Sequence, residues 1–315
     1  MSGLAILCSG QGRQDFASFE ALLKYPEARI IFERLRDSGL IPESLERYFD
    51  SPALNPGVIF DNESAQPFVV IYHIMLWEIL KNIIPDPSLF AGYSLGELSI
   101  YGLAGVIEAE DLLRLSVLRG HAMSKSAASS QAMVAVVGLN HDQIEKVCRA
   151  CDSYVAIINA EDHFVAGMPA DKMNIFVDEC RKSGASKTVH LPVSIASHTP
   201  YMVNAALEFS RELRKTCFHA SVSGIISGVS GEKLFSREAM IDALTLQISH
   251  TIDWRACMES AVSYGCRVFI ETGPGSSLSK MLLDLFPGIE ARSVSDFHDI
   301  RMMKNWVEAA MKRQR

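Results

Sequence analysis

The sequence has no apolar run that approaches the roughly 18 residues a membrane-spanning helix needs. Residues 1–8 are apolar, but they lack a basic flank and run straight into Gly10-Gln11-Gly12, which is not typical of a signal peptide. Basic residues are also in short supply, with 30 Lys and Arg against 37 Asp and Glu and a formal net charge of −7. That balance argues against nucleic acid as the main partner. We expect a cytoplasmic protein with no nucleic-acid and no membrane partner.

Cysteines are few and do not form a framework. There are 7 of them, an odd number spread over 315 residues, which indicates a reducing compartment rather than a set of disulfides. Cys148 and Cys151 form a single C-x-x-C pair, whereas a zinc site needs a second pair or nearby histidines. We interpret the pair as structural and expect no metal. A composition of 48% hydrophobic and 21% charged residues is that of an ordinary globular protein.

One stretch carries an unusual pattern, Gly92-Tyr93-Ser94-Leu95-Gly96. It fits the G-x-S-x-G nucleophile elbow, in which a serine sits on a sharp strand-to-helix turn and the flanking glycines leave room for the strained backbone. We expect a strand over Ser88 to Gly92 and a helix over Leu95 to Leu103. The amide of Leu95 and the positive end of that helix would then lie where an oxyanion forms beside Ser94.

Two further features are open to two interpretations each. A strand over Leu4 to Cys8 is followed by the glycine-rich turn Ser9 to Gln14, whose amides could face an anion or only make a tight connection. Arg119 lies among apolar residues of a helix predicted over Asp111 to Lys125. A buried guanidinium needs a partner: it either pairs with Glu97 or another acid, or it waits for a substrate carboxylate.

The middle of the chain predicts an inserted unit. Residues 126–130 are small and polar, as in a linker, and the following pattern predicts strand, helix, two strands, helix and strand up to Leu191. This βαββαβ order is ferredoxin-like. We expect an α/β fold with residues 1–127 and 193–315 in one domain and 128–192 in a small subdomain. Beyond it come Ser197-His198 and a strand ending in Thr272-Gly273-Pro274-Gly275, a turn for close packing or for an anion.

Taken in order, these motifs resemble the malonyl-CoA:acyl-carrier-protein acyltransferase family over nearly the whole chain. The resemblance rests on the order and spacing of Gly10-Gln11-Gly12, Gly92 to Glu97, Arg119-Gly120, Ser197-His198 and Gly273-Pro274-Gly275. It implies an α/β-hydrolase-like large domain with a ferredoxin-like insert. Family members usually carry histidine before the nucleophile. Tyr93 at this position is similar to the malonyltransferase (epsilon) subunits of bacterial malonate decarboxylases.

The resemblance also implies a role for each motif. Ser94 would be the nucleophile and His198 its base, and the amides of Gln11 and Leu95 would form the oxyanion hole. Arg119 would bind the free carboxylate of malonate. The histidine would be oriented by a main-chain carbonyl within His250 to Trp254, with the best match at Asp253.

The implied reaction is ping-pong malonyl transfer from malonyl-CoA to the phosphopantetheine-type arm of an acyl carrier protein, without metal or diffusible cofactor. Other malonate decarboxylase subunits would be partners. Two departures from the family stand out: Arg13 replaces a frequent serine, and Ile195-Ala196-Ser197-His198 matches neither of the two familiar selectivity signatures.

An acidic carrier needs a local basic surface on this acidic chain. We expect it either on the insert or on the helix that follows, with the candidates Arg181, Lys182 and Lys187, or Arg211, Arg214 and Lys215. Two other functions share the elbow. One is a serine esterase or thioesterase of the α/β-hydrolase type with His298 as base, and the other is a degenerate scaffold subunit.

Overall fold

A six-stranded sheet, mostly parallel, forms the centre of the protein. The computed structural model describes residues 3–127 and 129–314. The sheet order is β11-β10-β1-β2-β7-β8, in which neighbouring strands are parallel except for the pair β7 and β8. The strands are β1 (Gly3–Cys8), β2 (Leu89–Gly92), β7 (Gly224–Ile226), β8 (Lys233–Leu234), β10 (Cys266–Thr272) and β11 (Glu290–Ser293).

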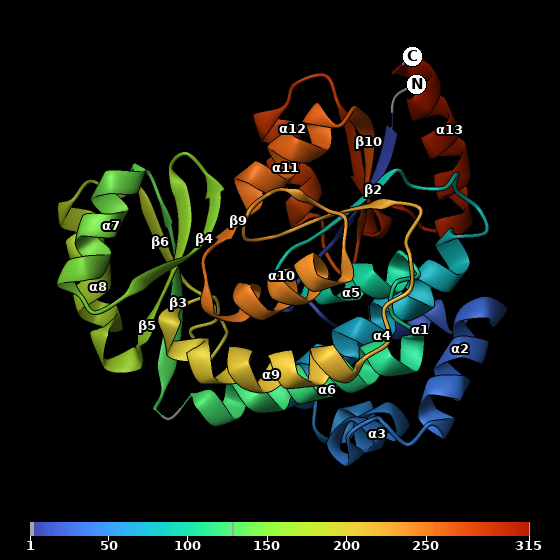
Figure 1. The fold of residues 1–315 in the computed structure, drawn as a ribbon, viewed down its shortest axis with the longest axis horizontal. Coiled ribbons are helices and arrows are strands. Elements are labelled where there is room, and N and C mark those ends of the chain that lie inside the picture. Colours follow the sequence, from blue (N-terminus) through green and yellow to red (C-terminus); the bar gives the residue numbers. More distant parts are fainter. Residues whose placement is uncertain (1–2, 128, 315) are drawn as a thin grey trace.

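Helices cover both faces of this sheet, so its central strands are apolar on both sides. Alternate residues of β1 show it: Leu4 and Ile6 pack in one cluster with the helices α4, α5, α6, α9 and α10, while Ala5 and Leu7 pack in another with α11 and α12 (Figure 1). The helices are α1 (Phe16–Leu22), α2 (Pro26–Asp37), α3 (Glu43–Asp50), α4 (Asn62–Leu80), α5 (Leu95–Leu103), α6 (Ala109–Ser126), α9 (Val203–Lys215), α10 (Arg237–Ser249), α11 (Trp254–Ser263), α12 (Ser277–Leu285) and α13 (Met303–Arg313).

The inserted unit has the predicted order of strand, helix, two strands, helix and strand. It lies on the left of Figure 1 and is made of β3 (Gln131–Val137), α7 (His141–Ala150), β4 (Tyr154–Ala160), β5 (His163–Pro169), α8 (Met173–Lys182) and β6 (Lys187–His190). The strand order is β6-β3-β5-β4, with antiparallel pairing throughout these four strands. The predicted start of the subdomain, residue 128, lies outside the described residues.

A fifth strand ties the insert to the main body. The short strand β9 (Ile252–Asp253) follows α10 and pairs in parallel with β4. The chain thus passes from the end of α10 into the insert sheet and then directly into α11. This crossing places the last turn of α10 between the two sheets, and that turn carries a residue of the candidate site.

Candidate active site

The turn around Ser94 has the geometry of a nucleophile elbow. β2 ends at Gly92 and α5 begins at Leu95, as the motif predicts, and Ser94 has φ 54° and ψ −117°. A Cβ atom on Gly92 would lie 2.2 Å from the backbone of Gly96, and one on Gly96 would lie 2.1 Å from the carbonyl oxygen of Cys8. Backbone atoms cannot yield at such distances, so both positions require glycine.

His198 is hydrogen-bonded on both ring nitrogens. Its Nε2 lies 2.7 Å from Ser94 Oγ, and its Nδ1 contacts the main-chain carbonyl of Gln247. A carbonyl only accepts, so Nδ1 carries the proton and Nε2 is left to accept the Ser94 hydroxyl. The main-chain amide of His198 also donates to the carbonyl of Ile248 at 2.9 Å. The end of α10 therefore fixes both the tautomer and the position of the ring.

The environment keeps this imidazole neutral. Burial and the nearby charge of Arg119 lower the pKa of His198 to about 3, while the carbonyl of Gln247 opposes the shift. Only 1% of the residue is exposed. The free lone pair on Nε2 is thus present at neutral pH and faces the serine.

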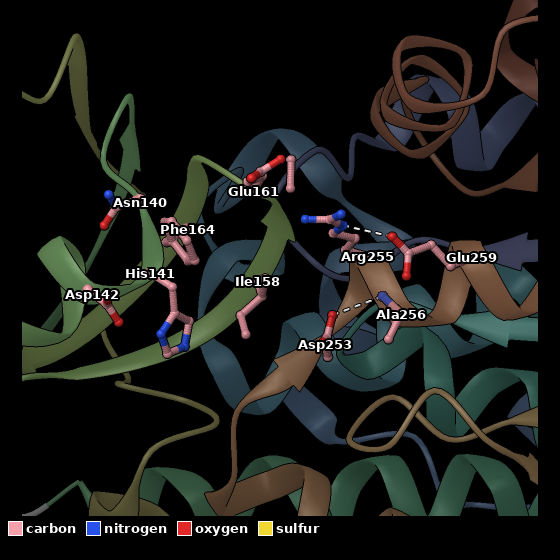
Figure 2. Close-up of a pocket in the computed structure, with 11 residues that line it drawn as sticks. Asn140, His141, Asp142, Ile158, Glu161, Phe164, Asp253, Arg255, Ala256 and Glu259 are labelled. Atoms are coloured by element: carbon pink, nitrogen blue, oxygen red, sulfur yellow. Dashed lines mark hydrogen bonds and ion pairs between the residues drawn. The ribbon is translucent and has the colours of Figure 1, made fainter.

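The prediction that a main-chain carbonyl within His250 to Trp254, best matched at Asp253, orients the histidine is wrong, because the carbonyl at His198 Nδ1 is that of Gln247. Asp253 caps α11 through its carboxylate, which accepts the amide of Ala256 at 2.9 Å. Asp253 lines a hollow of about 530 Å³ together with residues at the start of α7, and neither Ser94 nor His198 lines that hollow. Figure 2 shows the Asp253 side chain there. The carbonyl comes six residues earlier because α10 continues to Ser249 and places Gln247 against the ring.

Arg119 is buried without a carboxylate partner. It is 2% exposed, and its two terminal nitrogens donate to Gln66 Oε1 at 2.8 Å and to Gln247 Oε1 at 2.9 Å. No carboxylate of the described residues lies within ion-pair distance of it. Burial lowers the pKa of Arg119 to about 10, so the group stays charged at neutral pH. Two of its five N–H donors are used in these bonds, and the others remain for a ligand.

The side-chain carboxamide of Gln247 connects Glu97 to Arg119, and the two charged groups form no ion pair among the described residues. The Glu97 carboxylate accepts the amide of Gly228 at 3.0 Å and Gln247 Nε2 at 3.1 Å. Gln247 Nε2 also donates to the carbonyl of Ser94 at 2.6 Å. Burial raises the pKa of Glu97 to about 7. The direct pair of Arg119 with Glu97, one of the two sequence interpretations, is therefore absent from the described residues.

Gln247 was not among the site residues predicted from the sequence, yet it contacts Ser94, His198 and Arg119. A signal for it existed. Ser236 is an N-cap, with its side chain accepting the amide of Ala239, and it predicts a helix from residue 237 on. Gln247 lies three residues after Leu244, on the buried side of that helix, and a buried carboxamide must have polar partners.

The glycine-rich turn lies directly against the elbow. A Cβ on Gly10 would lie 3.0 Å from the carbonyl of Tyr93 and 3.4 Å from the Cβ of Ser94. Within the described part of the chain, no group accepts a hydrogen bond from the amides of Gln11 and Leu95. Leu95 is the first residue of α5, where an amide has no partner within the helix. Both amides are available to a ligand atom.

A pocket of about 590 Å³ opens beside this turn. It is bounded by the Gln11 loop, Tyr93, α12 and the insert strands β3, β4 and β5. The Tyr93 ring packs edge-on against Trp254, with centroids 5.4 Å apart. Burial raises the pKa of Tyr93 to about 12. Arg13 is exposed at the pocket's edge and lies over Gly275.

The turn before α12 and the pair Cys148 and Cys151 both have packing contacts in the structure. At the turn before α12, the buried carboxylate of Glu271 accepts the amides of Leu278 at 3.2 Å and Ser279 at 2.8 Å, which favours the packing role. Cys148 and Cys151 are buried in the core of the insert. Across the described ranges, no group of three or more His, Cys, Asp or Glu residues is placed to hold a metal ion.

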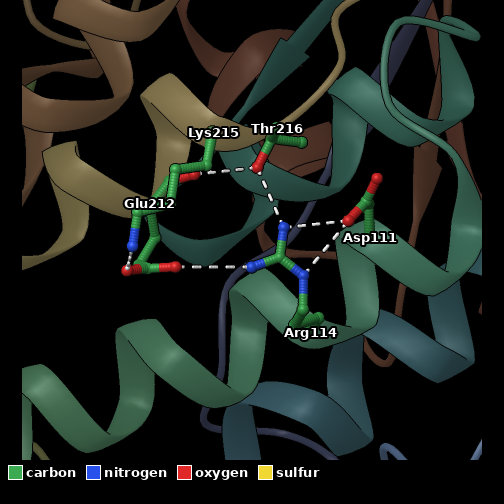
Figure 3. A network of polar contacts seen from close by, with 5 residues as sticks. All are labelled: Asp111, Arg114, Glu212, Lys215 and Thr216. Carbon is green, nitrogen blue, oxygen red and sulfur yellow. Dashed lines mark hydrogen bonds and ion pairs between the residues drawn. The ribbon is translucent and has the colours of Figure 1, made fainter.

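The predicted basic surfaces are largely neutralised. Arg181 pairs with Asp178, Lys182 with Glu179, and Arg214 with Glu238. Lys215 bonds Glu212, which also lies 3.6 Å from Arg114, so that network joins α9 to α6 (Figure 3). In the ranges that the structure describes, Lys187 and Arg211 form no ion pair.

Comparison with known proteins identifies the family. Residues 7–299 match the acyl transferase domain family. The chain is 31% identical to the malonyl CoA-acyl carrier protein transacylase of Escherichia coli K12 over 206 residues, 63% of this chain and 67% of that one. The corresponding protein of Staphylococcus aureus MRSA252 is 24% identical over 314 residues, 98% of this chain and 99% of the relative.

Solved structures agree over the whole chain. The crystal structure of FabD from Acinetobacter baumannii has a TM-score of 0.88 at 25% identity and covers 98% of this chain and 99% of its own. FabD from Xanthomonas oryzae has a TM-score of 0.87 at 26% identity, with 98% and 99% covered. The protein belongs to the acyl transferase domain family, and it is an acyltransferase. Of the helices described, none is long and apolar enough to cross a membrane.

Proposed function

We propose that the protein transfers malonyl groups from malonyl-CoA to the prosthetic-group thiol of an acyl carrier protein. The observation that carries this is the placement of Arg119, which is charged and buried, next to the Ser94–His198 pair; among the described residues its hydrogen-bond partners are two carboxamide oxygens. The relatives from E. coli and S. aureus bear the name of this activity.

The first half-reaction acylates the serine. His198 Nε2 takes the hydroxyl proton as Ser94 Oγ attacks the thioester carbonyl, and the Nδ1 contact with the Gln247 carbonyl stabilises the imidazolium that forms. The oxyanion is met by the amides of Gln11 and Leu95, and one such donor is typically worth about 3 kcal/mol. When the carbon–sulfur bond breaks, the imidazolium returns the proton to the departing thiolate of CoA.

The second half-reaction runs in the opposite direction. The thiol of a carrier protein's phosphopantetheine-type arm loses its proton to His198 and attacks the malonyl ester on Ser94. Collapse of the second tetrahedral intermediate releases the serine, which regains the proton. The malonyl group ends on the carrier, and both half-reactions balance without metal or diffusible cofactor.

Arg119 supplies the selectivity for a free carboxylate in two ways. An acetyl group would leave the buried guanidinium without its anion, at a cost of about 1–3 kcal/mol or more. In addition, the charge of Arg119 lowers the pKa of His198. A malonyl carboxylate on Arg119 offsets that charge and so strengthens the base, which favours attack on the carboxylate-bearing donor.

Intact-protein mass spectrometry after brief incubation with malonyl-CoA tests the proposal. We expect a malonyl adduct on the wild type, none on Ser94→Ala and a much smaller amount on Arg119→Ala. An adduct that persists in Ser94→Ala would exclude the serine as the acyl carrier.

The structure does not support the esterase alternative, in which His298 would be the base of Ser94. His298 is exposed near the C-terminus, whereas Ser94 Oγ is hydrogen-bonded to His198. The scaffold alternative is disfavoured, because Ser94 is hydrogen-bonded to His198 and Gln247 connects Ser94 to Arg119.

We further propose that the physiological carrier is the carrier subunit of a malonate decarboxylase. Tyr93 motivates this, and its ring on Trp254 forms part of the pocket wall beside Gln11. The test compares malonyl transfer to that subunit and to a fatty-acid carrier protein under equal conditions. A preference for the fatty-acid carrier would contradict the assignment.

We also propose that the fold consists of an α/β-hydrolase-like domain, 1–127 and 193–315, with a ferredoxin-like insert, 128–192. The parallel central strands with an elbow after β2 support the first part. The antiparallel order β6-β3-β5-β4 supports the second, because the fourth and first strands of the motif are neighbours in a ferredoxin-like sheet.

A further inference from the structure

Glu97 is a buried acid for which the acyl-transfer chemistry has no task. It is 0% exposed, it follows the nucleophile on α5, and it lies one carboxamide away from the arginine that is proposed to bind the substrate. Its oxygens accept bonds from Gly228 N and Gln247 Nε2. Burying a carboxylate costs free energy. An acid that served only the fold could meet its partners at the surface, so the burial of Glu97 calls for another explanation.

The two carboxamides on Arg119 are held in different ways. Gln66 presents its oxygen because its Nε2 donates to Asn62 Oδ1 at 2.9 Å, a neutral partner. Gln247 presents its oxygen because its Nε2 donates to Ser94 and to the acid Glu97. The empty site therefore holds one cation and one anion that are joined through Gln247 and do not touch.

A substrate carboxylate changes the net charge of the enclosed groups. With the acyl carboxylate on Arg119, the enclosed groups carry two negative charges and one positive charge. An excess charge in a low-dielectric interior is relieved by the group that protonates most easily. Each oxygen of a carboxyl keeps an accepting lone pair after protonation, so Glu97 can take a proton and keep both of its hydrogen bonds.

We propose that Glu97 is a charge-compensating residue, which at pH 8 is anionic while Arg119 is unoccupied and takes up one proton from solvent when an acyl carboxylate binds Arg119. This inference rests on the proposed function, because it requires a carboxylate-bearing acyl donor. Glu97 touches neither the substrate nor the reacting atoms. It acts through Gln247 and Arg119.

Among the titratable groups around Glu97, Glu97 itself is the one that exchanges a proton near neutral pH. Burial raises the pKa of Glu97 to about 7, while the hydrogen bonds from Gly228 and Gln247 and the charge of Arg119 on α6 favour its charged form. Burial raises the pKa values of Tyr101 on α5 and Cys257 on α11 well above their ordinary values. The pKa of His198 is about 3. At pH 7.5 to 8, none of these neighbours exchanges a proton.

Isothermal titration calorimetry on Ser94→Ala, which binds donors without reacting, counts the protons. Malonyl-CoA is titrated at pH 8 in buffers of different ionisation enthalpy, and acetyl-CoA serves as the control that cancels the phosphates of CoA. We expect the malonyl donor to take up a fraction approaching one proton more than the acetyl donor. Equal proton counts would overturn the inference.

Two variants in the same background assign the proton to its group. Ser94→Ala/Glu97→Gln carries a neutral side chain of the same shape, and we expect the excess proton uptake to disappear. Its affinity for malonyl-CoA should be flat between pH 7 and 9, where the parent weakens by up to about tenfold per pH unit. Tyr101→Phe is the matched control on the same helix, and it should keep the proton uptake. Uptake that survives Glu97→Gln would assign the proton elsewhere and overturn the proposal.

A failure of the inference is distinguishable from a failure of the proposed function. If Ser94→Ala binds malonyl-CoA no better than acetyl-CoA, Arg119 does not recognise a carboxylate, and both fall. If malonyl-CoA is preferred but no excess proton is bound, only the role of Glu97 is refuted. The comparison of the two donors needs no variant of Glu97, so it stands even if Glu97→Gln does not fold.

Discussion

Arg119→Ala separates recognition of the acyl carboxylate from chemistry at the serine. Its guanidinium is buried, so the malonyl carboxylate would lose a desolvated, charge-assisted contact. Breaking such a pair costs about 2–5 kcal/mol, which corresponds to a decrease of roughly 30- to 5000-fold in kcat/KM for malonyl-CoA. Acetyl-CoA makes no such contact, so its kcat/KM should not fall.

The acetyl rate should in fact rise in this variant. The charge of Arg119 lowers the pKa of His198, and its removal makes the imidazole a stronger base. Acyl-enzyme formation is measured for both donors by quenched-flow mass spectrometry, with circular dichroism to check that the variant is folded. An equal loss of rate for malonyl-CoA and acetyl-CoA would refute the reasoning, because it would show damage to the site rather than loss of selectivity.

Three other outcomes are expected. Gly92→Ala should lower the free energy of unfolding by about 3 kcal/mol or more, measured in urea, since its Cβ would lie 2.2 Å from the backbone of Gly96; a stable variant would contradict the elbow geometry. The folded-state pKa of His198 is lowered from 6.5 to about 3, so its contribution to stability is present above pH 6.5 and is lost as the pH falls toward 3, by up to about 5 kcal/mol. His198→Gln should lose less stability over that range than the wild type, and an equal loss would argue against a buried neutral imidazole. Charge reversal of Lys182 and Lys187 should slow transfer to the carrier without changing acylation by malonyl-CoA, and we expect most of the effect from Lys187, because Lys182 already pairs with Glu179; unchanged carrier kinetics would exclude the insert as the docking surface.

Local patterns were sufficient to predict much of the fold. The helix Leu95 to Leu103 and the insert elements follow from periodicity and from turn residues, because their apolar faces are set by neighbours in the sequence. The short strand β9 could not be predicted in this way. It has two residues, Ile252 and Asp253, and it exists because α10 delivers the chain to the edge of β4.

The site shows the same division. Ser94 is recognisable because the elbow demands glycines on both sides of it. The main-chain carbonyl that orients His198 cannot be recognised in the sequence, because every residue has such a carbonyl. Which residue supplies it depends on where α10 ends. Nor could the sequence decide between the two roles of Arg119. The structure excludes only the direct pair with an acid, because the partners of Arg119 among the described residues are Gln66 and Gln247; the substrate role remains our proposal.

The proposed mechanism requires a malonyl ester on Ser94, which forms from malonyl-CoA and is then transferred to the thiol of the carrier protein. The most direct test is to expose the enzyme to malonyl-CoA, remove all CoA by rapid desalting, and add carrier protein that bears its phosphopantetheine-type arm. Mass spectrometry then follows both proteins in a single turnover. We predict that the malonyl mass leaves the enzyme and appears on the carrier in equal amount, and that Ser94→Ala gives none. Malonylation of the carrier only while malonyl-CoA is present would contradict the account.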